Sequence, residues 1–75
     1  MTVQQTWQKE VEEAISSGLP WRLLSVWFAP MLGPYSAELA HTRSGKRRVV
    51  TVSPQAFATP ATRKAEIVRQ LDAPL

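Results

Sequence analysis

The stretch "YSAELAHTRSGKRRVVTVS", residues 35 to 53, decides how this chain is expected to fold. From Tyr35 to Thr42, apolar and polar side chains alternate, which is typical of a strand with one face in water. Arg47 to Ser53 carries three valines and indicates a returning strand. The four residues RSGK between the strands favour a hairpin tip. The stretch therefore predicts two antiparallel strands joined by a short turn.

A further strand is expected just before this hairpin, over "WRLLSVWF", residues 21 to 28. Strict alternation places Trp21 and Trp27 on one face with Leu23 and Ser25, and puts the remaining four side chains on the other. Because both faces are largely apolar, the strand is either covered on both sides or shows one aromatic face to a partner. The following segment APMLGP, residues 29 to 34, predicts a turn because proline and glycine interrupt regular structure.

The N-terminal segment, residues 3 to 17, predicts a helix because its apolar residues recur at helical spacing. Thr2 and Gln5 have the spacing of a capping box at its start. Gly18 suits a left-handed cap at its end. Trp7, which lies in the apolar stripe, is expected to be in the core.

The C-terminal segment, residues 60 to 72, predicts a second helix, with Thr59 as its cap and Pro60 in its first turn. The connection before it, starting at Ser53, has room for a single helical turn. Residues 1 to 75 are thus expected to form one small α+β domain in the order α-β-β-β-α. Its three-stranded antiparallel meander would be packed with two helices.

Composition argues against several classes of chemistry. The chain has 75 residues, no cysteine and a single histidine, so neither a thiolate site nor a two-histidine metal site is expected. No apolar run approaches the length of a membrane span. We therefore expect a soluble, cytoplasmic protein that is not an enzyme, with no catalytic residues, no cofactor and no metal.

The net charge of +3 is unevenly distributed, with an acidic first helix and a basic middle. Four cations crowd around the hairpin tip, and alternation prevents Arg47 and Arg48 from serving the same surface. They either keep the tip soluble or attract an anionic partner. The residues expected to bind a protein partner are the hairpin cations and two tryptophans: Arg43, Lys46, Arg47, Arg48, Trp21 and Trp27.

These features favour a small regulator or inhibitor that docks on an acidic patch of a larger protein. Its size suggests a phage or mobile-element origin, for which host RNA polymerase or a defence complex would be a target. A subunit that folds fully only in an oligomer is a further alternative. The first hypothesis predicts that replacing Lys46, Arg47 and Arg48 by Ala weakens partner binding but leaves the melting temperature nearly unchanged.

The predicted order of elements, the Gly33-Pro34 pair and the stretch "TRKAE", residues 62 to 66, are similar to those of double-stranded RNA-binding domains. The resemblance implies that Arg63 and Lys64 contact phosphates across the major groove. It keeps open an alternative function as a nucleic-acid-binding module. In that alternative the contacts would come from the hairpin and the start of the last helix: Arg43, Lys46, Arg47, Arg63 and Lys64.

Overall fold

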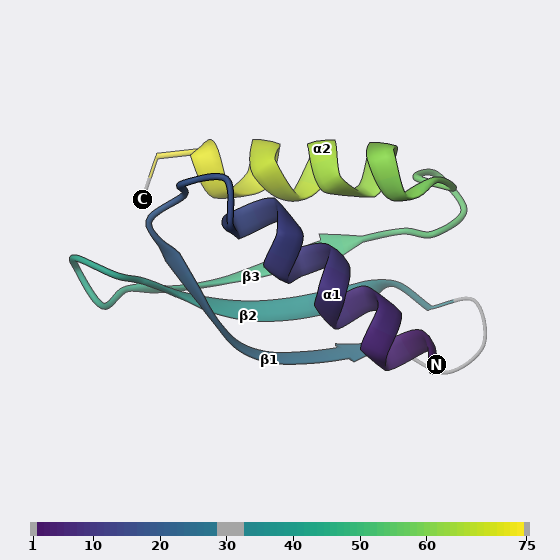
Figure 1. Ribbon diagram of the computed structural model, residues 1–75, viewed down its shortest axis with the longest axis horizontal. Coiled ribbons are helices and arrows are strands. Elements are labelled where there is room, and N and C mark those ends of the chain that lie inside the picture. Colours follow the sequence, from purple (N-terminus) through teal and green to yellow (C-terminus); the bar gives the residue numbers. More distant parts are fainter. Residues whose placement is uncertain (1, 29–32, 75) are drawn as a thin grey trace.

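The computed structural model describes residues 2–28 and 33–74 and contains five regular elements. They follow the predicted order, as Figure 1 shows: α1 (Val3–Ile15), β1 (Trp21–Phe28), β2 (Tyr35–His41), β3 (Arg47–Val52) and α2 (Pro60–Asp72). The α+β fold class is confirmed, although α1 ends two residues earlier than expected and β2 and β3 each end one residue earlier. Residues 29–32 of the expected APMLGP turn lie outside the described residues.

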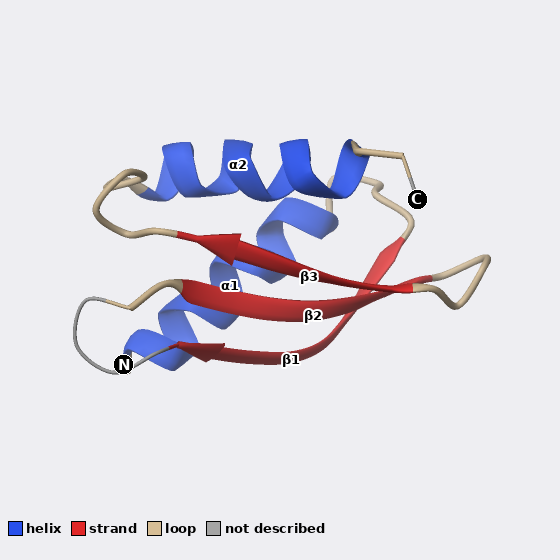
Figure 2. Cartoon of the chain, turned by 180° about the vertical axis from the view of Figure 1, so that it is seen from behind, coloured by secondary structure: helices blue, strands red, loops and turns tan. Residues whose placement is uncertain are grey.

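The three strands form an antiparallel sheet in the order β1-β2-β3, with β2 in the centre. Both helices lie on the same side of this sheet: α1 crosses the strands and α2 runs along β3 (Figure 1). Seen from behind in Figure 2, the strands lie in front of α1, and no described helix covers that face. We call it the open face. Within the described ranges, neither helix is long and apolar enough to cross a membrane.

A bulge in β1 changes which of its side chains reach the core. Leu23 pairs with Leu39 and Ser25 pairs with Glu38, so Leu24 is an extra residue on β1. Beyond it the alternation is reversed. Trp21 therefore lies in the core while Trp27 lies on the open face, 43% exposed. The prediction that the two tryptophans share a face was wrong because it assumed an unbroken strand.

The core fills the space between the sheet and the two helices, and Trp7 of α1 is its largest fully buried side chain. The Trp7 side chain is 1% exposed, which confirms its expected place. Its indole Nε1–H donates a hydrogen bond of 2.7 Å to the backbone carbonyl oxygen of Ser36, so the one polar atom of the ring is satisfied. Its ring also packs against Tyr35 at 5.5 Å between centroids. Trp7 thereby fixes how α1 sits on β2.

The helix ends follow the sequence closely. At the start of α1, the hydroxyl of Thr2 accepts from the Gln5 backbone N–H and the Gln5 side chain accepts from the Thr2 N–H, forming the predicted capping box. Gly18, after α1, has a φ of +106°, a conformation that favours glycine. The Phe57 N–H donates to the Ser53 carbonyl, closing the single turn expected between β3 and α2.

The free edge of β3 is covered by a side chain of α2. The Gln70 amide accepts a hydrogen bond from the Thr51 N–H at 3.2 Å and donates one to the Thr51 carbonyl at 2.8 Å. It thus occupies the place of a neighbouring strand residue. The Glu66 carboxylate accepts hydrogen bonds from the Gln70 amide and from the Arg69 guanidinium, and it thereby orients the Gln70 side chain toward β3.

This arrangement predicts a pH dependence of stability. The hydrogen bonds from Arg69 and Gln70 lower the pKa of Glu66 from 4.5 to about 2. A carboxyl whose pKa is lower in the folded than in the unfolded chain contributes stability above the unfolded value, and this contribution is lost as pH falls through the folded value. Between pH 4.5 and 2, urea unfolding should therefore show a smaller stability loss in Glu66→Gln than in the unsubstituted protein. Glu12→Gln, on the exposed side of α1, is the control and should retain the full loss; equal slopes for all three proteins would contradict the prediction.

Candidate functional site

The open face is built from three cross-strand rows of side chains. The row nearest the hairpin is Arg22, Ala40 and Arg47, and the middle row is Ser25, Glu38 and Val49. The far row is Trp27, Ser36 and Thr51. The central strand contributes the small residues Ala40 and Ser36, both buried by their neighbours. The two outer strands contribute the largest side chains of this face, those of Arg22, Trp27 and Arg47, and the central strand adds the half-buried carboxylate of Glu38.

Large apolar side chains are exposed on this face. Leu24 at the bulge is 38% exposed, Trp27 is 43% exposed and Val49 is 51% exposed. Single exposed apolar residues are ordinary. These three lie on a sheet face that no described helix covers, where a partner could bury them together. Trp27 is the strongest of them as a binding residue, because tryptophan is enriched among residues that dominate binding energy.

The hairpin tip extends from the end of the sheet beside the cationic row (Figure 2). His41 shapes the turn: its Nδ1 accepts from the backbone N–H groups of Arg43 and Ser44 at 3.3 and 3.2 Å. Gly45 adopts a φ of +74° and donates its N–H to the His41 carbonyl. The turn is thus held by its own backbone and one imidazole. The side chains of Arg43 and Lys46 are exposed.

Arg48, which was expected to bind a partner, is used within the molecule. It pairs with Leu39, so it lies on the helix-covered face. Its guanidinium donates three hydrogen bonds of 2.7 to 2.8 Å to the backbone carbonyls at the end of α2, those of Gln70, Ala73 and Pro74. A cation at a helix C-terminus also interacts favourably with the helix dipole. Arg48 therefore anchors α2, and its guanidinium is not available to a partner in this arrangement.

Trp21 was also expected to bind a partner, but its side chain lies in the core and is 5% exposed. Its ring lies below the Arg48 guanidinium, 5.4 Å from ring centroid to Cζ, and meets the His41 ring edge-on at 5.1 Å. Trp21 thus supports the base of the hairpin from inside. Of the two tryptophans, only Trp27 offers a surface for a partner.

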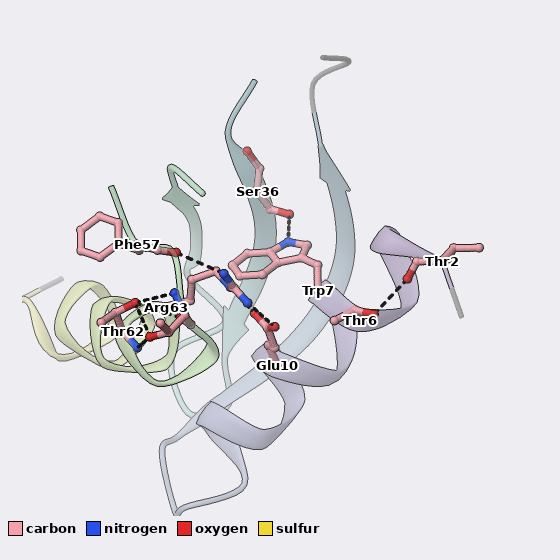
Figure 3. A network of polar contacts seen from close by, with 9 residues as sticks. Thr2, Thr6, Trp7, Glu10, Ser36, Phe57, Thr62 and Arg63 are labelled. Carbon is pink, nitrogen blue, oxygen red and sulfur yellow. Dashed lines mark hydrogen bonds and ion pairs between the residues drawn. The ribbon is translucent and has the colours of Figure 1, made fainter. Parts of the chain in front are cut away.

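Arg63, which the resemblance assigned to phosphate contact, is paired within the chain. Its guanidinium donates two hydrogen bonds, of 2.7 and 2.9 Å, to the Glu10 carboxylate and a third to the Phe57 carbonyl, as Figure 3 shows. Both side chains of the ion pair are nearly buried, at 13% and 11% exposed. The Glu10 carboxylate raises the pKa of Arg63. The pair joins α1 to α2.

Lys64 is exposed, but it does not extend the basic hairpin. Helix α2 begins at the end of the molecule opposite the hairpin tip, along a long axis of 35 Å (Figure 1). The five residues proposed for nucleic acid therefore do not form one surface. In the described ranges, the cations that gather at the hairpin end and whose side chains make neither an ion pair nor a hydrogen bond are Arg22, Arg43, Lys46 and Arg47.

Sequence reasoning missed Arg22, Leu24 and Val49 as parts of the surface. Only the strand register shows that Arg22 and Arg47 lie in the same cross-strand row, because β2 separates their two strands.

In the described residues no cluster of three potential metal ligands occurs. Comparisons with protein-family models, with curated proteins and with solved structures find no match to this chain.

Proposed function

We propose that this protein is a binding protein that docks its open face and hairpin onto an acidic surface of a larger protein and so regulates or inhibits it. The observation that carries the proposal is the coexistence of exposed apolar side chains and unpaired guanidinium groups on one helix-free face. Trp27 lies at one end of this face and Arg22 and Arg47 lie at the other. The chain has no cysteine, which supports a cytoplasmic setting as part of the proposal.

Charge complementarity defines the partner. The face and the tip together carry four cations and a single carboxylate, that of Glu38. Such a surface would be repelled by a basic protein and attracted to an acidic one, which affects the association rate and partner choice more than affinity. The apolar residues would supply the affinity through burial. We therefore expect a partner with an acidic rim around an apolar or aromatic patch.

A protein partner fits this surface better than a nucleic acid does. Binding to duplex phosphates relies on many cations with little apolar contact. Here Arg63 is held by Glu10 and Arg48 is held by the end of α2, so the basic set is reduced. Leu24 and Val49 would face phosphates without any favourable contact.

Capture of the partner from nuclease-treated lysate of the native cells tests the proposal through variants of the face. Trp27→Ala and Arg47→Glu should each reduce the captured amount of the same protein about tenfold or more, since tryptophan and arginine are enriched among the interface residues that contribute more than about 1.4 kcal/mol. The matched controls are Val3→Ala and Lys64→Glu, which change exposed apolar and basic side chains away from the face. They should capture as much as the unsubstituted protein does.

Two outcomes would reject the proposal. One is capture that is equally strong for the face variants and for the controls. The other is capture that disappears after nuclease treatment together with salt-sensitive binding of duplex DNA or RNA, which would assign the cations to phosphates.

A further inference from the structure

We infer that the open face contains a built site for a single carboxylate side chain, an Asp or Glu of the partner, between Arg22 and Arg47. This inference rests on the proposed function, because it names the group of the acidic partner that the face would recognise. The two arginines flank Ala40 in one cross-strand row. They also line one hollow of about 290 Å³ at the base of the hairpin.

The spacing of the row suits a carboxylate. Adjacent strands lie about 4.8 Å apart, so the backbones of Arg22 and Arg47 are separated by roughly 10 Å across β2. Ala40, between them, has only a methyl group and lines the hollow together with the two arginines. A carboxylate placed there accepts hydrogen bonds of about 2.8 Å from a guanidinium on each side. A larger residue at position 40 would occupy that volume.

Both guanidinium groups are free to bind. Among the described residues, neither Arg22 nor Arg47 makes a hydrogen bond or an ion pair through its side chain, and both are exposed. The nearest carboxylate on the face belongs to Glu38 in the next row, and it forms no ion pair with either arginine. The adjacent arginine Arg48 differs in this respect, since its guanidinium donates three hydrogen bonds to backbone carbonyls.

The walls of the hollow favour a carboxylate on an alkyl stem over a phosphate. Leu24 lines one side and provides an apolar contact for the methylene groups of an Asp or Glu. Phosphate sites usually add several free backbone N–H groups to their cations. Here the His41 N–H donates to the Lys46 carbonyl and the Gly45 N–H donates to the His41 carbonyl, so these amides are already used.

The test is an NMR titration of the labelled protein with the blocked peptide acetyl-Ala-Glu-Ala-amide, followed at the arginine Nε–Hε signals. The Arg22 and Arg47 signals should move together and fit one dissociation constant on the order of tens of millimolar, since each of the two exposed ion pairs contributes about 1 kcal/mol or less. The Arg43 signal, at the tip beyond the hollow, is the internal control and should move at least threefold less. The same peptide with Gln in place of Glu should shift neither arginine.

The variant Ala40→Leu fills the hollow without changing any charge, and Ala65→Leu on the exposed side of α2 is its matched control. Ala40→Leu should abolish the saturable shifts and reduce partner capture at least fivefold, while Ala65→Leu should do neither. The melting temperature of each variant shows that it is folded. The inference is overturned if Arg43 moves as much as Arg22 and Arg47 or if Ala40→Leu responds like the unsubstituted protein. It is equally overturned if inorganic phosphate saturates the site more tightly than the Glu peptide does.

The titration requires no partner, so its failure can be told apart from failure of the docking proposal. A flat titration together with face-dependent capture rejects the carboxylate site alone. A saturable titration together with capture that ignores Trp27 and Arg47 rejects the docking function and leaves the carboxylate site.

Discussion

Replacing Trp7 by Ala is expected to unfold the domain at 25 °C. The substitution removes the largest fully buried side chain and leaves a cavity between α1 and the sheet. Changes of this kind cost about 3–5 kcal/mol. A single core in a chain of this size supplies about 3–5 kcal/mol in total, so nothing remains to hold the native state. Far-UV circular dichroism and the dispersion of amide NMR signals measure the loss directly.

Two further variants make the expectation about Trp7 specific. Trp27→Ala is the same substitution on the open face, where the ring is 43% exposed, and should cost about 1 kcal/mol or less. Trp7→Phe keeps most of the packing but removes the indole donor to the Ser36 carbonyl. It should remain folded and lose about 1–3 kcal/mol in urea unfolding, because a buried polar group loses its partner. A well-folded Trp7→Ala variant, or equal losses for Trp7→Ala and Trp27→Ala, would contradict the description of the core.

Replacing Arg48 by Met should lower the free energy of unfolding by about 2 kcal/mol, because hydrogen bonds from a charged group are worth about 1.5–3 kcal/mol. The variant retains the stem of the side chain but loses all three hydrogen bonds to the end of α2 and the contact of the cation with Trp21. In a domain of this size, such a loss lowers the melting temperature by roughly 10 °C. Thermal unfolding followed by circular dichroism measures it.

The adjacent residue is the control. Arg47 lies on the opposite face with no partner within the described chain, so Arg47→Met should change stability by no more than about 0.5 kcal/mol. At a temperature at which both variants are folded, Arg47→Met should reduce the amount of captured partner more than Arg48→Met does. Equal melting temperatures for the two variants would show that Arg48 does not anchor α2.

The structure also revises our expectation for the triple Ala variant of Lys46, Arg47 and Arg48. This variant should now melt at a lower temperature than the unsubstituted protein, because it removes the Arg48 side chain.

Local patterns were enough to predict the elements of this fold. The hairpin was predicted from alternation on both sides of a glycine-containing turn. The helix starts were predicted from Thr2 and Thr59, whose hydroxyls accept a hydrogen bond from the backbone N–H three residues later. Trp7 was placed in the core because its helix has one apolar stripe. All of these signals are carried by residues that are neighbours in sequence.

The bulge at Leu24 could not be predicted. No glycine or proline marks it in "WRLLSVWF", and alternation gives no sign of the extra residue when both faces are apolar. The consequence for the site was large, since it separated Trp21 from Trp27. A one-residue change of register transfers every following side chain to the other face.

The roles of Arg48 and Arg63 could not be predicted either, because their contacts are distant in sequence. Arg48 contacts residues 22 to 26 positions away, and Arg63 contacts Glu10 at a separation of 53 residues. Composition shows how many cations a chain has but not which of them are paired after folding. The structure separates Arg48 and Arg63, which hold the helices in place, from the four cations that remain free beside the hairpin.

The central claim is that the open face is the docking surface, and hydroxyl-radical footprinting of the complex with the captured partner tests it most directly. The method compares the oxidation rate of individual side chains in the free and bound protein. We expect oxidation of Trp27 and Leu24 to fall at least threefold on binding, while Val3 on α1, 49% exposed, stays unchanged. Protection of Val3 with unchanged oxidation of Trp27 would place the partner on the helices and contradict the account.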